Sequence, residues 1–126
     1  MRAVDTNVVV RLIARDNVAQ TALAEAFVMK GAWVSQLVLV ETIWVLDSVF
    51  GLNHKQLALA VEMLLNHRDL VIQDPDVVAA ALAHYRKRPK LGFSDCMVLE
   101  VARKTGHSPI ATFDREFGKL EGTQRL

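Results

Sequence analysis

Short apolar runs alternate along the chain with longer segments whose apolar residues recur at helical spacing. Runs bounded by turn residues and too short for a helix are typical of buried strands. Buried strands that alternate with helices indicate a parallel sheet covered on both faces. We therefore predict an α/β protein with four or five parallel strands. The expected strands cover residues 1–4, 32–34, 70–72 and 109–112, with a weaker one at 123–126.

Capping residues mark where the predicted helices begin and end. Asn17 with Gln20, and Asn53 with Gln56, have the spacing of capping boxes. Gly31 is a typical stop signal for the helix before it. The expected helices cover residues 8–13, 17–30, 36–50 behind the cap Ser35, 53–66, 75–88 behind the cap Asp74, and 94–104.

The length of the chain allows one domain, because 126 residues leave no room for two ordinary cores. We expect this domain to span residues 1–126. No apolar run approaches the ~20 residues that cross a bilayer, and the N-terminus lacks the apolar stretch of a secretory signal. Cys96 is the only cysteine, which excludes an intrachain disulfide and favours a cytoplasmic protein. We expect Cys96 to be a small core residue.

Three acidic residues fall where a parallel α/β fold gathers its ligands. Asp5 follows the first predicted strand, and Asp114 follows the fourth. Asp95 lies in the first turn of its predicted helix. Ligands of parallel sheets bind beyond the carboxyl ends of the strands. We therefore expect all three acids at the same edge of the sheet.

Glu41 lies inside a predicted helix, on the stripe shared with Leu37, Val45 and Ser48. We expect this stripe to face the body of the protein, where an acid needs a partner. Carboxylates about 5 Å apart repel by about 3 kcal/mol per pair at an effective dielectric near 20. A cluster of four acids therefore requires protons or a cation. Carboxylate ligands favour Mg²⁺ or Mn²⁺ over Zn²⁺.

Each acid alone also has a simpler interpretation. Asp5 could cap a helix, Asp95 could interact with a helix dipole, and Asp114 could belong to a surface turn. The prediction of a metal site depends on the four acids together.

A run of basic residues precedes Asp95, and Arg11 follows Asp5. Cations there could contact phosphates of a nucleic acid, although a solvated helix end explains the run equally well. The net charge is only +1, but four acids gathered at one site would leave the remaining surface basic. The run consists of Arg86, Lys87, Arg88 and Lys90.

The histidines and aromatic residues carry weaker signals. No histidine pair has the spacing of metal ligands, so we expect His54, His67, His84 and His107 at the surface or at caps. Aromatic residues are too few for recognition of single strands by the stacking that OB-folds use. Several large apolar residues could serve a dimer or partner surface, with the core favoured for most: Trp44, Phe50, Leu57, Met63 and Leu64.

Four short segments, in this order, resemble the PIN-domain family, and they fit best the bacterial toxins of the VapC type. The resemblance covers essentially the whole chain and implies a three-layer α/β/α sandwich with a central parallel sheet. The segments are Val4-Asp5-Thr6-Asn7, Val40-Glu41-Thr42, Ser94-Asp95-Cys96-Met97 and Thr112-Phe113-Asp114-Arg115-Glu116-Phe117.

The resemblance also assigns roles to the matching residues. It implies three acids, matched by Asp5, Glu41 and Asp95, and a fourth, more variable one, matched by Asp114. Asp5 and Asp95 are the first choice for direct metal ligands, whereas Glu41 could bind through water or orient the nucleophile. The polar residues expected to support the acids or bound water are Thr6, Asn7, Ser94 and Thr112.

The implied reaction is hydrolysis of RNA phosphodiester bonds with Mg²⁺ or Mn²⁺, leaving 5′-phosphate and 3′-hydroxyl ends. One or two ions would activate water and stabilise the charge on the phosphate. The resemblance further implies a homodimer and a cognate antitoxin that blocks the acidic pocket.

Three alternatives remain at this point. A phosphatase of the haloacid-dehalogenase type needs a second carboxylate where this chain has Asn7. A receiver domain needs an aspartate at the end of its third strand, where Gln73 stands beside Asp74. A degenerate PIN domain that binds or assembles without catalysis is the more serious alternative.

Overall fold

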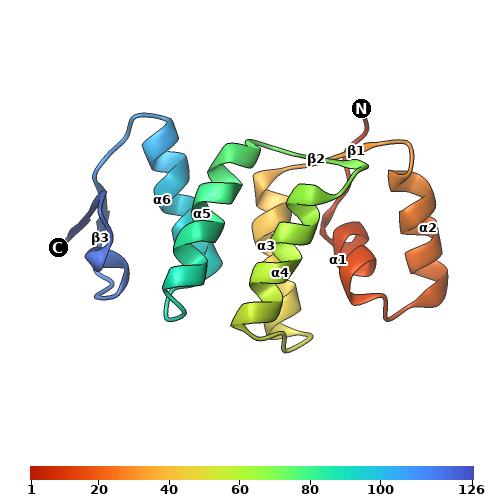
Figure 1. Ribbon diagram of the computed structural model, residues 1–126, viewed down its shortest axis with the longest axis horizontal. Helices are drawn as coiled ribbons and strands as arrows, with labels where there is room; N and C mark the ends of the chain where they lie inside the picture. The colour runs from red at the N-terminus through yellow and green to blue at the C-terminus, as the bar shows by residue number, and fades with distance from the viewer. The chain divides into compact units, whose positions relative to one another are not determined.

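The structure is a computed structural model that describes all of residues 1–126. The chain divides into two compact units, Met1–Pro75 and Asp76–Leu126. Helices and short strands alternate in both units (Figure 1). The first unit contains α1 (Thr6–Ala14), α2 (Val18–Val28), β1 (Ala32–Val34), α3 (Gln36–Ser48), α4 (His54–Asn66) and β2 (Leu70–Ile72). From the boundary onward follow α5 (Pro75–Lys87), α6 (Phe93–Lys104), β3 (Ile110–Thr112), the 3₁₀ turn η1 (Phe117–Lys119) and β4 (Thr123–Arg125).

All strand pairing is parallel. In the first unit β1 pairs with β2, with Trp33 opposite Val71, and Ala3 adds an isolated parallel bridge to Trp33. In the second unit β3 pairs with β4, with Ala111 opposite Gln124. The predicted α/β class with parallel strands is therefore confirmed. The strands form two two-stranded sheets; one central sheet in a three-layer, single-domain sandwich stays a prediction.

The predicted caps are formed to different degrees. Around α4 the capping box is complete, because the Gln56 N–H donates to Asn53 Oδ1 and the Asn53 N–H donates to Gln56 Oε1, both at 2.9 Å. At α2, Asn17 accepts the Gln20 N–H at 2.9 Å. The side-chain Oε1 of Gln20 instead accepts from Arg11 Nε at 2.7 Å. The capping box predicted for Asn17 and Gln20 is thus only half formed.

The starts of α3 and α5 combine local and tertiary contacts. Ser35 caps α3 as predicted, with its Oγ accepting the Val38 N–H at 3.1 Å. Pro75 is the first residue of α5, also as predicted. Asp74 before it has φ +47°, and its carboxylate accepts from Gln36 Nε2 at 3.0 Å. Asp74 therefore links the start of α5 to the start of α3.

Each unit has its own buried apolar residues. Leu39, Leu46 and Val61 are fully buried in the first unit, and Val78 and Leu99 in the second. Cys96 is fully buried, which confirms it as a core residue. No helix is both long and apolar enough to span a bilayer. Among the five residues considered for a partner surface, Leu57 and Leu64 are buried, Phe50 is half-buried, and Trp44 and Met63 are exposed.

Candidate functional site

Asp5 is the N-cap of α1. Its backbone is extended, and its Oδ1 accepts the Val8 N–H at 3.3 Å. A carboxylate in this position satisfies an otherwise unpaired helix N–H and interacts favourably with the helix dipole. The side chain is otherwise exposed, and this bond uses only one of its two oxygens. Asp5 therefore caps its helix and still presents a carboxylate to solvent.

Glu41 lies on the exposed face of α3, so the prediction of an inward stripe was wrong. Leu37 on the same stripe is 83% exposed. The buried face of α3 consists of Leu39, Thr42, Ile43 and Leu46. Because apolar residues occur on every side of this helix, its sequence does not distinguish the inward face. Glu41 is a solvated carboxylate in the same unit as Asp5.

Asp95 and Asp114 interact electrostatically within the second unit. Asp95 lies in the first turn of α6 and is half-buried. Its burial, and next the negative charge of Asp114, raise the pKa of Asp95 above the ordinary value of 3.8. Both causes disfavour the ionised carboxylate. A bound cation near the two acids would reverse this preference.

The turn after β3 holds Asp114 in place. Its N–H donates to Thr112 Oγ1 at 3.0 Å, and its Oδ1 accepts the Phe117 N–H at 2.7 Å. In this turn a hydrogen bond from Lys119 lowers the pKa of Glu116, with the charges of Lys119 and Lys90 acting in the same direction. Lys90, which precedes α6 in the chain, is therefore close enough to influence this turn. The turn interpretation of Asp114 is confirmed, and it leaves the second carboxylate oxygen available.

The carboxylates of the second unit fit a hydrated divalent ion. No group of three or more His, Cys, Asp or Glu side chains lies close enough to hold a metal ion. Mg²⁺ usually keeps several waters and uses one or two protein carboxylates together with substrate phosphates. The Asp95 and Asp114 pair matches that requirement in number and in donor type. Convergence of all four acids stays a prediction.

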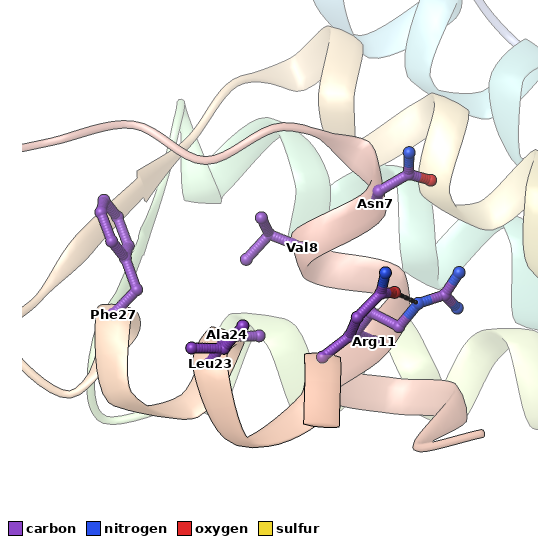
Figure 2. Close-up of a pocket in the computed structure, with 7 residues that line it drawn as sticks. Asn7, Val8, Arg11, Leu23, Ala24 and Phe27 are labelled. Carbon is purple, nitrogen blue, oxygen red and sulfur yellow. Dashed lines mark hydrogen bonds between the residues drawn. The ribbon is translucent and has the colours of Figure 1, made fainter. Parts of the chain in front are cut away.

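The polar residues expected to support the acids differ in what they contact. Thr112 bonds to the backbone of Asp114, as described above. Thr6 is half-buried at the first position of α1, and Ser94 is exposed in the first turn of α6. Asn7 lines a cavity of about 320 Å³ between α1 and α2 (Figure 2), whose walls also include Val8 and Phe27.

The basic candidates differ in how exposed they are. Arg11 lines the same cavity (Figure 2) and donates to Gln20 Oε1 and, at 2.9 Å, to Asp16. Its guanidinium is therefore already used within the chain. The run before α6 is more open: Arg86, Lys87 and Lys90 are exposed, and Arg88 is half-buried. Contact of any of these residues with RNA stays a prediction.

The second unit also contains a buried acid that none of the sequence-based predictions covers. Glu100 on α6 is only 8% exposed, and its Oε1 lies 2.7 Å from His84 Nε2 of α5 and 3.6 Å from Arg103 Nε. His84 lies partly at the surface, with its side chain 28% exposed, and contacts Glu100 from there. Glu100 shares the apolar stripe of Phe93 and Cys96, and this pattern signals an acid that needs a partner.

The other histidines match their prediction more closely. His67 is the C-cap residue of α4, and its Nδ1 accepts the Asp69 N–H at 3.0 Å. His107 is exposed and lies 3.0 Å from Thr105 Oγ1. His54 is the half-buried first residue of α4. His67 and His107 therefore take part in local contacts at the ends of helices.

Comparison with known proteins identifies one family. The family model for the PIN domain matches residues 2–122, almost the entire chain. No curated protein and no solved structure matches the chain.

Proposed function

This chain belongs to the PIN domain family, a family of nucleases, and we propose that it is a Mg²⁺- or Mn²⁺-dependent endoribonuclease. The observation that carries the proposal is the pair formed by Asp95 and Asp114, in which burial and a neighbouring negative charge oppose ionisation. A divalent cation would remove that cost by neutralising the pair. The family typically uses such ions.

The proposed reaction is hydrolysis of an RNA phosphodiester bond. A divalent ion, when bound, supplies a water of lowered pKa and stabilises the charge that develops on the phosphate. We assign Asp95, Asp114 and Asp5 as carboxylates that bind the ion, and Glu41 as the acid that orients the attacking water or binds through it. Asp114 is pre-oriented for this role, because its backbone and one carboxylate oxygen are already fixed by hydrogen bonds. Thr6, Asn7 and Ser94 are proposed to support the acids.

Cations before α6 are proposed to hold the RNA backbone. Lys90 is the best supported, because it is exposed and its charge acts on the turn that carries Asp114. Phosphate contacts of this kind position a nucleic acid without reading its sequence. Arg86, Lys87 and Arg88 extend the positive charge. Arg11 is a weaker candidate than Lys90, because Gln20 and Asp16 already engage it.

The biological setting is proposed from the resemblance to toxins of the VapC type. In that setting the protein is a cytoplasmic toxin, forms a homodimer and is inhibited by a cognate antitoxin. Exposed apolar side chains on α3 support a protein partner: Leu37 is 83% exposed and Trp44 is 65% exposed. Apolar residues gathered on one exposed helix face are typical of protein contact surfaces.

One observation favours a second candidate, a PIN domain that binds RNA without cutting it. The chain contains no group of three acidic or other metal-binding side chains close enough for one ion. A module of this kind would bind RNA in the presence of Mg²⁺ and leave it intact.

Incubation of the purified protein with a mixed RNA pool separates the two candidates. We expect cutting in Mg²⁺ or Mn²⁺, none in chelator, and 5′-phosphate ends on the products. Asp5→Asn and Asp95→Asn should abolish cutting while circular dichroism shows a retained fold. Equal cutting by the wild type and both variants would indicate a contaminating nuclease and contradict the proposal.

A matched control comes from α3 itself. Asp47 is an exposed acid on the same helix as Glu41, and Asp47→Asn removes one negative charge outside the proposed site. Asp47→Asn should cut RNA at the wild-type rate, whereas Glu41→Gln should not. If both variants lose activity equally, a general change in surface charge explains the loss.

A further inference from the structure

Only two aromatic side chains of this protein are more than half exposed, and each lies beside a proposed site acid. The chain has eight aromatic residues, counted as five Phe, two Trp and one Tyr. Six are buried or half-buried. Trp44 lies one turn after Glu41 on α3, and Phe113, at 81% exposure, directly precedes Asp114.

Phe113 is exposed on a segment whose backbone is held on both sides. Thr112 ends β3, and the Leu126 N–H donates to its carbonyl oxygen at 2.8 Å. After Phe113, the Asp114 carboxylate accepts from Phe117, whose ring is buried. A ligand that contacts Phe113 therefore meets a ring on an ordered backbone, which lowers the entropic cost of binding.

The charges around Phe113 suit an RNA strand. Asp114 is the adjacent residue, and neighbouring Cα atoms lie about 3.8 Å apart. The ring is thus within reach of the nucleotides that flank a phosphate bound at the carboxylate pair. Lys90 acts on the same turn, and Arg115 is exposed next to Asp114. Positive charge beside an exposed aromatic ring is the combination with which proteins bind single-stranded nucleic acids.

We propose that Phe113 is a stacking platform for an unpaired nucleobase next to the cleaved phosphate. The proposal rests on the proposed nuclease function and deepens it, because a base must be unstacked to lie on this ring. The preferred substrate is therefore single-stranded or loop RNA. Stacking accepts any base, so Phe113 selects unpaired RNA rather than a particular sequence.

The test measures RNA binding in chelator, where no cutting interferes, with a short single-stranded RNA and a hairpin of the same composition. Phe113→Ala should weaken binding to the single strand by about 5- to 150-fold, the range expected for loss of one stacked base. Phe113→Leu, which keeps apolar volume without a π-face, should also lose affinity, and Phe113→Trp should retain it. Leucine as effective as phenylalanine would overturn the proposal.

Abasic substitution identifies the contacted nucleotide. Removing that one base should weaken wild-type binding as much as Phe113→Leu does, with no further loss when both changes are combined. Lys90→Ala should lose affinity mainly at low salt, whereas the loss in Phe113→Leu should persist at high salt, since stacking is not a counterion effect. Additive losses at every abasic position would contradict the proposal.

Two further readouts separate the possible failures. Phe113→Leu should melt within about 2 °C of the wild type, because the ring is exposed and surface substitutions usually change stability little. A large loss of stability with unchanged RNA binding would mean that the ring serves packing, which overturns the proposal. Absence of metal-dependent cutting by the wild type would contradict the proposed nuclease function. The comparison of RNA binding in chelator would still test whether a base stacks on Phe113.

Discussion

In both units, one proposed site acid is an aspartate at the end of a strand segment that accepts a backbone N–H from the turn after it. In each unit one aspartate follows a strand segment and caps the helical turn after it: Asp5 accepts from Val8 in the first, and Asp114 accepts from Phe117 in the second. The other acid of each unit lies on a helix, Glu41 on α3 and Asp95 on α6. The strand-end acid is therefore fixed in both units by local backbone geometry.

The helix-borne acids are where the units differ. Glu41 is exposed, and its helix is held by apolar packing of Leu39 and Leu46. Asp95 is half-buried and repelled by the charge of Asp114. Its helix is joined to α5 by the hydrogen bond between Glu100 and His84. The second unit therefore keeps an unfavourable charge arrangement that a cation would relieve, and the first unit does not. This difference makes Asp95 the principal candidate for a metal ligand.

The largest expected effect comes from removing charge while keeping the cap. Asp5→Asn and Asp114→Asn retain a side-chain oxygen that can accept the helix N–H, so the melting temperature should stay close to that of the wild type. The rate of RNA cutting should fall by about 100-fold or more, because a carboxylate that binds the ion is lost. Asp5→Ala should additionally cost about 1 kcal/mol of stability. Cutting rates and thermal melts of the three variants check this prediction.

If Asp5→Asn cuts RNA normally and only Asp5→Ala is impaired, Asp5 is a structural cap and nothing more. Of the two strand-end aspartates, only Asp114 in the second unit would then take part in the reaction.

The next effect concerns the contact between His84 of α5 and Glu100 of α6. His84→Ala removes one partner of the buried Glu100 carboxylate and should cost about 1–3 kcal/mol of unfolding free energy. Asp47→Asn on α3 of the first unit is the control and should change stability by less than about 0.5 kcal/mol. Urea denaturation of both variants measures the difference. A neutral His84→Ala would show that Arg103 alone suffices for Glu100.

Metal binding should distinguish the two helix-borne acids. At ten times its dissociation constant, Mg²⁺ or Mn²⁺ should stabilise the wild type by about 1.4 kcal/mol, seen as a higher melting temperature. Asp95→Asn should abolish this shift, whereas Glu41→Gln should leave at least part of it. If metal-induced stabilisation persists in Asp95→Asn but disappears in Glu41→Gln, Glu41 rather than Asp95 is the principal candidate for a metal ligand.

The smallest effect is the stability gained when the charge of Asp95 is removed. Because the folded-state pKa of Asp95 is raised above 3.8, its ionised form destabilises the fold at pH values above that raised pKa. The penalty falls as the pH drops through the raised pKa toward 3.8. In the absence of metal, Asp95→Asn should therefore be more stable than the wild type at neutral pH, by less than ~1 kcal/mol because the group is partly exposed. Thermal melts from pH 7 to pH 4 should show this gain shrinking.

The sequence by itself determined the elements and the places of the acids along them. All five expected strand regions take part in parallel pairing, and Ser35 and Asn53 cap the helices that they were expected to cap. These features are local: a cap depends on three or four neighbouring residues, and a short apolar run between turns leaves few alternatives. Asp5 and Asp114 could be placed at strand ends for the same reason.

Only the tertiary structure decided which helix faces are buried and which acids interact. The sequence of α3 is apolar on all sides, so its periodicity does not identify the inward face, and Glu41 proved to be exposed. Glu100 is buried because His84, on a different helix, supplies its partner. The interaction of Asp95 with Asp114 likewise joins residues from separate elements. Burial and charge pairing depend on packing between elements distant in sequence, and a pattern of 3.6-residue or two-residue period contains no information about that packing.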